Sequence, residues 1–365
     1  NVTVEGDNNT IQDLTVEGNL TDNGQNNSVG DAVITSNSPG GSIIIEGTDA
    51  SISNTQAENV TVNGSATITD STVSNDGAGS ITVTSSGSAT VSGSSADSVS
   101  NEGTVTFSNS SADSVSGNGE TNLGSNAVQT TGSDAVFNTV QGAVDASGDG
   151  DTVTVENGTY NENFVLTSRA LTLKAADGAN PTVNVGDTRN EIQADNVTID
   201  GISVVFESQG IYVTNGNDNV TIQNSEFTLP AGVESTGDAI RYEGGTSDGE
   251  IRNNTFTGIS TSTDGEFGNG IVLAGPDGFE VVGNTFENNS IGVNVGNNQN
   301  PDGLVIRDNT FTNQDDFGVA LNHDDSASPN ITVSGNNFNS SSVGILTLAG
   351  GNIDVSNNGF TGDSN

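Results

Sequence analysis

Short runs of alternating apolar and polar residues recur along the whole chain. Val and Ile occupy every second position in segments such as SITVTS at 80–85, TVTV at 152–155 and NVTI at 196–199. A period of two places the apolar side chains on one face of an extended chain, as in a β-strand with one buried face. Gly, Asn and Asp, which favour tight turns, separate these runs. The pattern therefore predicts an all-β protein built from many short strands.

One unit repeats between residues 196 and 360. Its copies read NVTIDGISV, NVTIQNSEF, EIRNNTF, FEVVGNTF, LVIRDNTF, NITVSGNNF and NIDVSNNGF, and they end at residues 204, 227, 256, 286, 311, 338 and 360. A second apolar run, such as GIYV at 210–213 or GIVL at 270–273, follows most copies. Repeats of this length without intervening helices are typical of solenoids, whose neighbouring coils pair strand on strand. We therefore expect a parallel β-helix with at least two strands in each coil.

Two residue types recur at fixed places in this unit. Most copies end in Phe, and most carry Asn two positions earlier. In coils stacked ~4.8 Å apart, equivalent residues lie above one another. The sequence thus predicts an internal aromatic stack of Phe227, Phe256, Phe286, Phe311, Phe338 and Phe360. It also predicts a column of hydrogen-bonded amides, at a corner where Asn tolerates the left-handed conformation, made by Asn254, Asn284, Asn309, Asn336 and Asn358.

This run resembles the right-handed parallel β-helix repeats of the pectate-lyase-like superfamily. It is most similar to the NosD-like and carbohydrate-binding repeats of secreted and archaeal surface proteins. Upstream, residues 137–166 resemble the start of such helices, and Phe137, Val140 and Val144 share one face of a short capping helix expected near 137–146. The resemblance covers residues 133–365 and implies the fold, whereas it leaves the activity open.

Residues 1–132 form a second, plainer segment that we expect to be a narrow β-solenoid. VTVEG at residue 2 returns as LTVEG at 14, IIIEG at 43 and VTVNG at 60, and SSADSVS occurs at 94 and 110. The coil length stays open, because the SSADSVS copies start 16 residues apart whereas NVTVNG, SITVTS and TVTFSN start at 59, 80 and 104. A mucin-like stalk is the alternative, but stalks lack apolar alternation.

The charge of the chain excludes several classes of partner. The chain has six Lys and Arg and 47 Asp and Glu, which gives a formal net charge of −41, and it has no Cys. Such a surface repels nucleic acid and anionic membranes. Carboxylates at this density are tolerated when molar salt shortens the screening length to ~3 Å, so we expect a halophilic protein, with calcium loading as the competing explanation.

Two segments carry residues of metal or acid–base chemistry. Asp145, Asp149 and Asp151, followed by Glu156, match the spacing of a calcium-binding loop. The alternative to a calcium-binding loop is that this segment is a glycine-rich helix end followed by a strand. The segment 315–325 gathers four aspartates around His323 and is expected to be a solvated acidic loop.

No catalytic residue is predicted. The resemblance implies calcium-binding aspartates with a basic catalytic residue for lyases, and a paired Asp, Gln and Arg arrangement for pectin esterases. Neither set can be matched residue by residue here. The basic residues are scattered and are expected to serve as local counter-charges: Arg169, Lys174, Arg189, Arg241, Arg252 and Arg307.

Sequons for N-glycosylation are frequent, which suits a protein at the cell surface or outside the cell. The favoured acceptors are Asn8, Asn19, Asn26, Asn59, Asn63, Asn109, Asn157, Asn253, Asn288 and Asn339.

These observations favour a non-enzymatic extracellular structural protein of a halophile, a filament or cell-surface subunit whose copies join head to tail. The end-to-end contact is expected because Asn1 opens directly on a strand pattern and Phe360 closes a repeat. A secreted β-helix enzyme or carbohydrate-binding module is the alternative, and a viral tail fibre or spike is a second one. We expect that no cofactor is required, and calcium is the candidate metal ion. Besides copies of the chain itself, a cell-surface glycan is a candidate partner. Neither nucleic acid nor a membrane span is expected.

Overall fold

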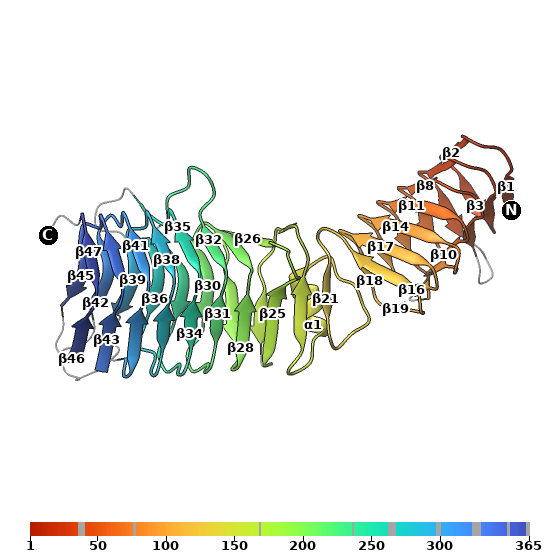
Figure 1. Ribbon diagram of the computed structural model, residues 1–365. Helices are drawn as coiled ribbons and strands as arrows, with labels where there is room; N and C mark the ends of the chain where they lie inside the picture. The colour runs from red at the N-terminus through yellow and green to blue at the C-terminus, as the bar shows by residue number, and fades with distance from the viewer. Residues whose placement is uncertain are drawn as a thin grey trace. The chain divides into compact units, whose positions relative to one another are not determined.

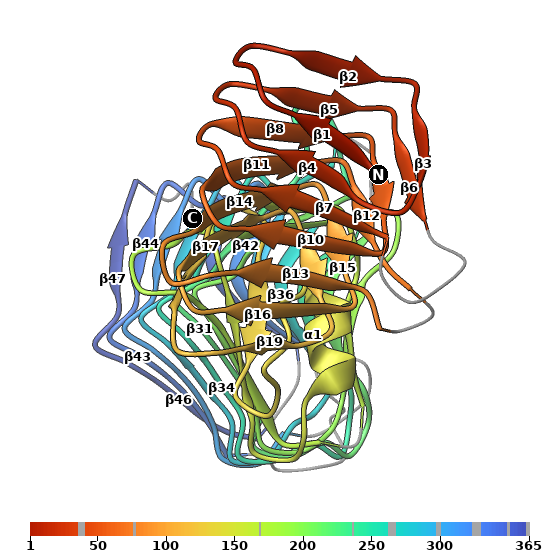
Figure 2. The same ribbon diagram turned by 90° about the vertical axis from the view of Figure 1, so that its right-hand side faces the viewer.

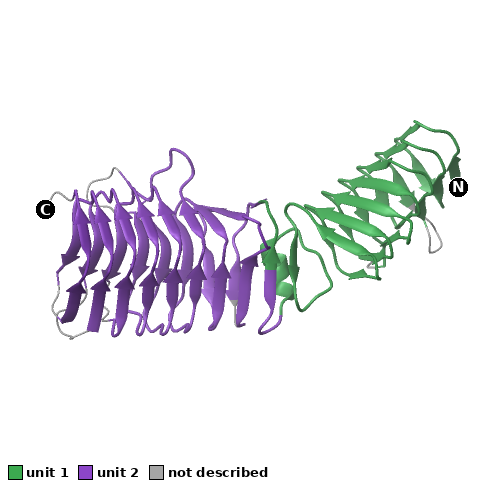
Figure 3. Cartoon of the chain, viewed as in Figure 1, with its two compact units in different colours: residues 1–147, 154–158 green, residues 148–153, 159–365 purple. Residues whose placement is uncertain are grey.

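A computed structural model describes residues 1–35, 41–75, 78–167, 169–235, 237–261, 268–296, 301–322, 330–348 and 351–362. The chain forms two compact units, residues 1–147 with 154–158 and residues 148–153 with 159–365 (Figure 3). The boundary expected after residue 132 stays a prediction. Strands are short and neighbouring strands pair in parallel, as Figure 1 shows along each ladder. The predicted all-β class and parallel β-helix are confirmed.

The strands of unit 1 run in three ladders, and Figure 2 labels strands of each ladder. One 7-stranded sheet has the order β1-β4-β7-β10-β13-β16-β19, with bounds Val2–Val4, Leu20–Asp22, Ser42–Ile45, Asn59–Val62, Ser80–Val83, Ser98–Asn101 and Val115–Ser116. Another 7-stranded sheet has the order β2-β5-β8-β11-β14-β17-β20, with bounds Thr10–Gln12, Ser28–Gly30, Ala50–Ser53, Ser65–Thr69, Ser88–Ser92, Thr104–Ser108 and Glu120–Leu123. A 6-stranded sheet has the order β3-β6-β9-β12-β15-β18, with bounds Thr15–Glu17, Val33–Thr35, Gln56–Ala57, Thr72–Val73, Ser95–Ala96 and Ser111–Ala112.

Three larger sheets follow. The 10-stranded sheet has the order β21-β22-β25-β28-β31-β34-β37-β40-β43-β46, with bounds Val128–Thr130, Thr152–Val155, Leu171–Ala175, Val197–Asp200, Thr221–Gln223, Glu250–Arg252, Glu280–Val282, Leu304–Arg307, Asn330–Ser334 and Asn352–Ser356. The 9-stranded sheet has the order β23-β26-β29-β32-β35-β38-β41-β44-β47, with bounds Thr159–Tyr160, Thr182–Gly186, Ser203–Phe206, Glu226–Thr228, Thr255–Thr257, Thr285–Glu287, Thr310–Thr312, Asn337–Asn339 and Gly359–Thr361. The 8-stranded sheet has the order β24-β27-β30-β33-β36-β39-β42-β45, with bounds Val165–Thr167, Asn190–Gln193, Gln209–Val213, Asp238–Tyr242, Asn269–Leu273, Ile291–Gly296, Phe317–Asn322 and Val343–Thr347.

Coil length in unit 1 varies, which explains why the repeats in its sequence are unevenly spaced. A column of buried hydroxyls marks one corner: the Thr55 amide donates to Ser71 Oγ 16 residues later, and the Ser71 amide donates to Ser94 Oγ 23 residues later. NVTVNG and SITVTS pair in one sheet through β10 and β13, whereas TVTFSN forms β17 in another sheet. The three segments therefore do not measure one coil length, because alternating runs occur on more than one face of each coil.

The core of unit 2 contains the expected aromatic stack. Phe256, Phe286 and Phe311 are fully buried, with ring centroids 4.8 and 4.7 Å apart and planes within 6° of parallel. Phe227 and Phe338, which are also buried, and Phe360 continue the stack at spacings of 4.8 to 5.0 Å. Phe360 was expected to be internal but is 52% exposed, because no further ring covers it in the described residues. Val and Ile of all three sheets fill the space around the rings.

A column of asparagines lies at the corner between the 10-stranded and 9-stranded sheets. Asn284 Nδ2 donates to Asn309 Oδ1 (3.0 Å) and to the Ile251 carbonyl (2.8 Å), and Asn309 Nδ2 donates to Asn336 Oδ1 (3.0 Å). At the two ends of the column, Asn254 Nδ2 donates to Asn284 Oδ1, and Asn358 Oδ1 accepts from Asn336 Nδ2. The left-handed residue of this corner is the one before each column member, such as Asn253 or Asp308, and not the column member itself. The expectation about φ was wrong by one position, because the turn must come first if the amide is to point inward.

The helix α1 (Val140–Ala146) confirms the short helix expected near 137–146. Thr139 caps it, since its Oγ1 accepts the Gly142 amide at 3.1 Å. Val140, Ala143 and Val144 are buried, and the helix packs against β21. No helix in the described ranges has the length and hydrophobicity that crossing a bilayer requires.

Candidate functional site

Polar side chains gather on the outer face of the 8-stranded sheet. In β30, Tyr212 stands between two buried apolar residues, and Arg241 stands between two buried residues in β33, so alternation directs both away from the core. The parallel register places Tyr212 beside Arg241 and Gln209 beside Asp238. In the next strand, β36, Asn269 pairs with Asp238. We call these five residues the outer-face cluster.

Asp238 is the most buried member of the outer-face cluster, with a relative exposure of 6%. Its Oδ2 lies 3.2 Å from Arg241 Nη1, and its Oδ1 accepts a hydrogen bond from Asn269 Nδ2 at 2.8 Å. Arg241 Nε also donates to Glu243 Oε1 at 2.6 Å. Burial raises the pKa of Asp238, and the donors around the carboxylate oppose that rise. A charged group this deep and outside the apolar core is held by a network of partners.

Arg189 extends the outer-face cluster by one coil. Its guanidinium carbon lies 3.8 Å from the centroid of the Tyr212 ring, which is a cation–π contact. Its Nη1 donates to Gln209 Oε1 at 3.1 Å, and its Nη2 lies 3.5 Å from Glu191 Oε1. Burial raises the pKa of Tyr212, and so does the nearby carboxylate of Glu243. Both arginines of this face are therefore already paired with carboxylates.

An open polar depression of about 570 Å³ adjoins the outer-face cluster. We call it the Asp238 pocket, and it is lined by Glu207, Ser208, Gln209, Glu234, Ser235, Gly237, Asp238 and Thr261. The side chain of Glu207 shares a hydrogen bond with Asp187 of the preceding coil, which raises the pKa of Glu207 together with the repulsion between the two carboxylates. Ser235 supports the rim, since its Oγ donates to the Glu207 carbonyl at 2.7 Å.

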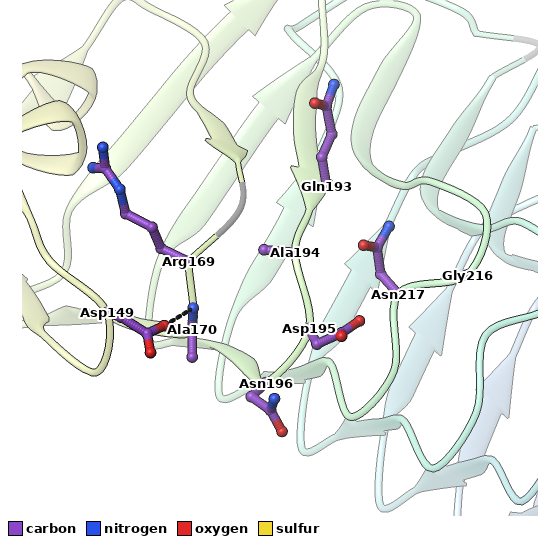
Figure 4. Close-up of a pocket in the computed structure, with 9 residues that line it drawn as sticks. All are labelled: Asp149, Arg169, Ala170, Gln193, Ala194, Asp195, Asn196, Gly216 and Asn217. Atoms are coloured by element: carbon purple, nitrogen blue, oxygen red, sulfur yellow. Dashed lines mark hydrogen bonds between the residues drawn. The ribbon is translucent and has the colours of Figure 1, made fainter.

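A second depression, of about 380 Å³, follows the turns that lead into β25, β28 and β31 (Figure 4). Asp149 Oδ1 accepts the Ala170 amide at 2.8 Å, and Asp195 Oδ1 accepts the Asp218 amide at 2.8 Å. In Figure 4 the Arg169 side chain points away from the Asp149 carboxylate. The acids here join one coil to the next, so the groups in this depression primarily hold the turns together.

The calcium-loop residues are engaged separately. Asp145 accepts Gln141 Nε2 at 2.7 Å, and Asp151 Oδ2 accepts the Gly148 amide at 2.6 Å, while Asp149 holds Ala170. Across the described ranges, no three His, Asp or Glu side chains are grouped so that they could hold a metal ion. The calcium site at Asp145, Asp149 and Asp151 stays a prediction that a titration can test.

The basic residues behave largely as local counter-charges. Arg252 lies 3.1 Å from Glu250, and Arg307 lies 3.0 Å from Glu280, both on the 10-stranded sheet. Arg189 and Arg241 are also paired, but they are not scattered as expected, because the solenoid brings them to one face. Of the acidic segment 315–325, the structure describes Asp315 and Asp316 in the turn before β42, whereas 323–325 lie outside the described residues.

The ten favoured sequon asparagines are all exposed or half-buried. They differ in the exposure of the Ser or Thr that completes each sequon. Thr10 and Thr159, the partners of Asn8 and Asn157, are exposed, whereas Ser290 and Ser341, the partners of Asn288 and Asn339, are 1% exposed.

The outer-face cluster was not predicted, although the sequence contains a pattern that indicates part of it. The second strands read GIYV, AIRY, GIVL and GVNV, and their third positions hold Tyr212, Arg241, Val272 and Asn294. Because equivalent positions of successive coils stack, this alignment places Tyr212 next to Arg241. Asp238 and Gln209 begin those strands, and only the register shows that they adjoin each other.

Comparison with known proteins supports the fold. Residues 181–360 match the family model described as "Right handed beta helix region". No curated protein matches the chain.

Solved structures similar to this chain include a mutant of the periplasmic alginate epimerase AlgG (9% identity, 94% of this chain and 76% of that one, TM-score 0.36). An alginate lyase from a Paenibacillus species is also similar (11% identity, 92% of each chain, TM-score 0.31). A third is the tailspike of E. coli bacteriophage HK620 (11% identity, 93% and 69%, TM-score 0.34).

Proposed function

We propose that this chain is an extracellular β-helix protein that binds a saccharide at the Asp238 pocket and the adjoining outer-face cluster. The observation that carries the proposal is Asp238 itself. Its carboxylate is nearly buried, yet it lies outside the apolar core and at the edge of an open depression. A buried charge with a shifted pKa in a concave site is typical of binding and catalytic sites.

The chemistry of the lining favours a polyhydroxylated ligand. Among the lining residues, Gln209 carries an amide that both donates and accepts, Asp238 accepts, and the Ser235 and Thr261 hydroxyls do either. Sugar hydroxyls need this mixture of donors and acceptors. The volume of about 570 Å³ falls within the ~300–1,000 Å³ range of ligand pockets. The net charge of −41 disfavours nucleic acid as the ligand.

Isothermal titration with a panel of oligosaccharides tests the proposal. Gln209→Ala removes a pocket-lining amide, and we expect up to about tenfold weaker binding, the equivalent of one hydrogen bond. Gln223→Ala is the matched control, because Gln223 lies on the 10-stranded sheet and away from the Asp238 pocket. The proposal fails if no saccharide in the panel binds, or if Gln223→Ala weakens binding as much as Gln209→Ala.

Head-to-tail assembly, a halophilic source, N-glycosylation and a tail-fibre role stay predictions from the sequence. Sedimentation of the purified chain at molar salt checks the first of these, since assemblies that grow with concentration are expected.

A further inference from the structure

The Asp238 pocket has a strongly negative lining. Glu207, Glu234 and Asp238 line it, and none of the described lining residues is Lys or Arg. Asp187 adds another carboxylate beside Glu207 through their shared hydrogen bond. Arg241 lies next to Asp238 and is the nearest identified counter-charge, but its guanidinium also serves Glu243.

Both arginines of this face are already paired with carboxylates of the protein. Arg241 Nε and Nη1 are taken by Glu243 and Asp238, at 2.6 and 3.2 Å. Arg189 lies on the Tyr212 ring and contacts Gln209 and Glu191. A uronate carboxylate entering the pocket would meet like charges and would have to displace these pairs.

Resting on the proposed function, we infer that the saccharide bound in the Asp238 pocket carries a protonated amino group, as a 2-amino sugar does. An ammonium offers three donors and one positive charge, and Glu207, Glu234 and Asp238 bring three carboxylates to the lining, whose negative charge favours a cation. The sugar hydroxyls would then be bound by Gln209 and the hydroxyls of Ser235 and Thr261.

A cation between Glu207 and Asp187 also relieves an internal conflict. Their backbones are linked coil to coil, since the Glu207 amide donates to the Gly186 carbonyl at 2.9 Å. The side-chain hydrogen bond to Asp187 and the repulsion between the two carboxylates both raise the pKa of Glu207. An ammonium placed beside them supplies the opposite charge that the described residues of the pocket lining do not.

A pair of ligands that differ only in acetylation tests the inference. Glucosamine trisaccharide and its N-acetylated counterpart are titrated into the full chain at one fixed ionic strength, with a galacturonate trisaccharide as the anionic arm. We expect the amino form to bind roughly tenfold more tightly than the acetylated form, because only it carries the charge. The anionic sugar is expected to bind more weakly than both.

Matched variants separate the pocket from general attraction to an acidic protein. Glu207→Gln with Glu234→Gln should abolish the preference for the amino form, while Glu226→Gln with Glu287→Gln should preserve it. The control pair removes the same charge from exposed positions on the 9-stranded sheet. Equal loss in the two double variants would overturn the inference, because the attraction would then be unspecific. Equal affinity for the amino and acetylated forms also overturns it but leaves saccharide binding intact, whereas binding of none of the three sugars contradicts the proposed function itself.

Discussion

Single amides in the interior of unit 2 are expected to matter more than single charges on its surface. Asn309 is 1% exposed; its Oδ1 accepts the Asn284 amide (2.8 Å) and Nδ2 (3.0 Å), and its Nδ2 donates to the Val281 carbonyl (2.9 Å). Asn309→Leu removes all of these bonds. We expect it to lower the free energy of unfolding by ~1–3 kcal/mol for each buried group left unpaired. Thermal and urea unfolding followed by circular dichroism measures the loss.

The control for that substitution is Asn339→Leu, at an exposed position of β44. Surface changes of this kind usually stay within ~0.5 kcal/mol of neutral. If Asn339→Leu were as damaging as Asn309→Leu, the amide column would not be the cause.

The predicted glycosylation sites can be ranked by the exposure of both sequon residues. Asn8 and Asn157 are exposed together with Thr10 and Thr159, so a modifying enzyme can reach both side chains in the folded chain. Asn288 is exposed, but its partner Ser290 is buried. We expect peptide mass spectrometry of protein from its natural source to find glycan at Asn8 and Asn157 and none at Asn288. Modification of Asn288 at equal occupancy would show that attachment precedes folding.

At the level of strands, glycine and phenylalanine of different sheets depend on each other. A Cβ at Gly292 in β39 would lie 2.6 Å from the Phe311 ring of β41, and that ring is stacked at 4.7 and 4.8 Å between Phe286 and Phe338. The ring cannot move aside. Gly292→Ala should therefore cost ~1–3 kcal/mol in unfolding free energy as an overpacked core.

Phe311→Leu in the same chain opens space, so the double variant should lose less than the sum of the two single changes. Gly359→Ala is the neutral control, because its Cβ would meet nothing closer than 3.5 Å. Strict additivity of the two core changes would mean that they do not contact each other as described.

The outer-face cluster predicts a pH dependence of unit 2. Burial raises the pKa of Asp238 above 3.8 in the folded chain, so the folded state holds this proton more tightly than the unfolded state. The resulting stabilisation is fully present below pH 3.8 and is lost as the pH rises through the folded-state pKa. Asp238→Asn cannot titrate, so its melting midpoint should fall less than that of the native chain over this window. Parallel pH profiles of the two proteins would contradict this assignment.

For the whole molecule, the net charge of −41 predicts stability that depends on salt. The screening length is ~10 Å at 0.1 M salt and ~3 Å at 1 M, so repulsion between carboxylates of neighbouring coils is much reduced in molar salt. We expect the melting midpoint to rise steadily from low to molar KCl. A midpoint that ignores KCl would refute the halophilic interpretation, and full stabilisation by millimolar CaCl₂ instead would favour the calcium alternative.

Much of this architecture could be predicted from local sequence because a solenoid repeats its contacts. The six Phe residues from Phe227 to Phe360 occupy the same position in successive sequence repeats, and each ring stacks on the ring of the next coil. The Asn column follows from the same repetition. The short helix was predictable too, since Val140 and Val144 share one helical face. In unit 1 the variable coil lengths hid the periodicity, and only the SSADSVS copies indicated one of these lengths, a coil of 16 residues.

The sequence by itself determined the fold class and, between residues 196 and 360, the aromatic stack and the asparagine column inside the coils. Alternation and repeat spacing are local properties, so they can be recognised without knowledge of the tertiary structure. Only the tertiary structure decided which polar residues meet on the outside. Arg189, Tyr212 and Asp238 are separated by loops of different length, so no fixed spacing connects them. They become neighbours because the parallel register of β27, β30 and β33 aligns the strands regardless of the chain between them. The burial of Asp238 likewise depends on what surrounds it in space, and its charge network and pocket could be seen only there.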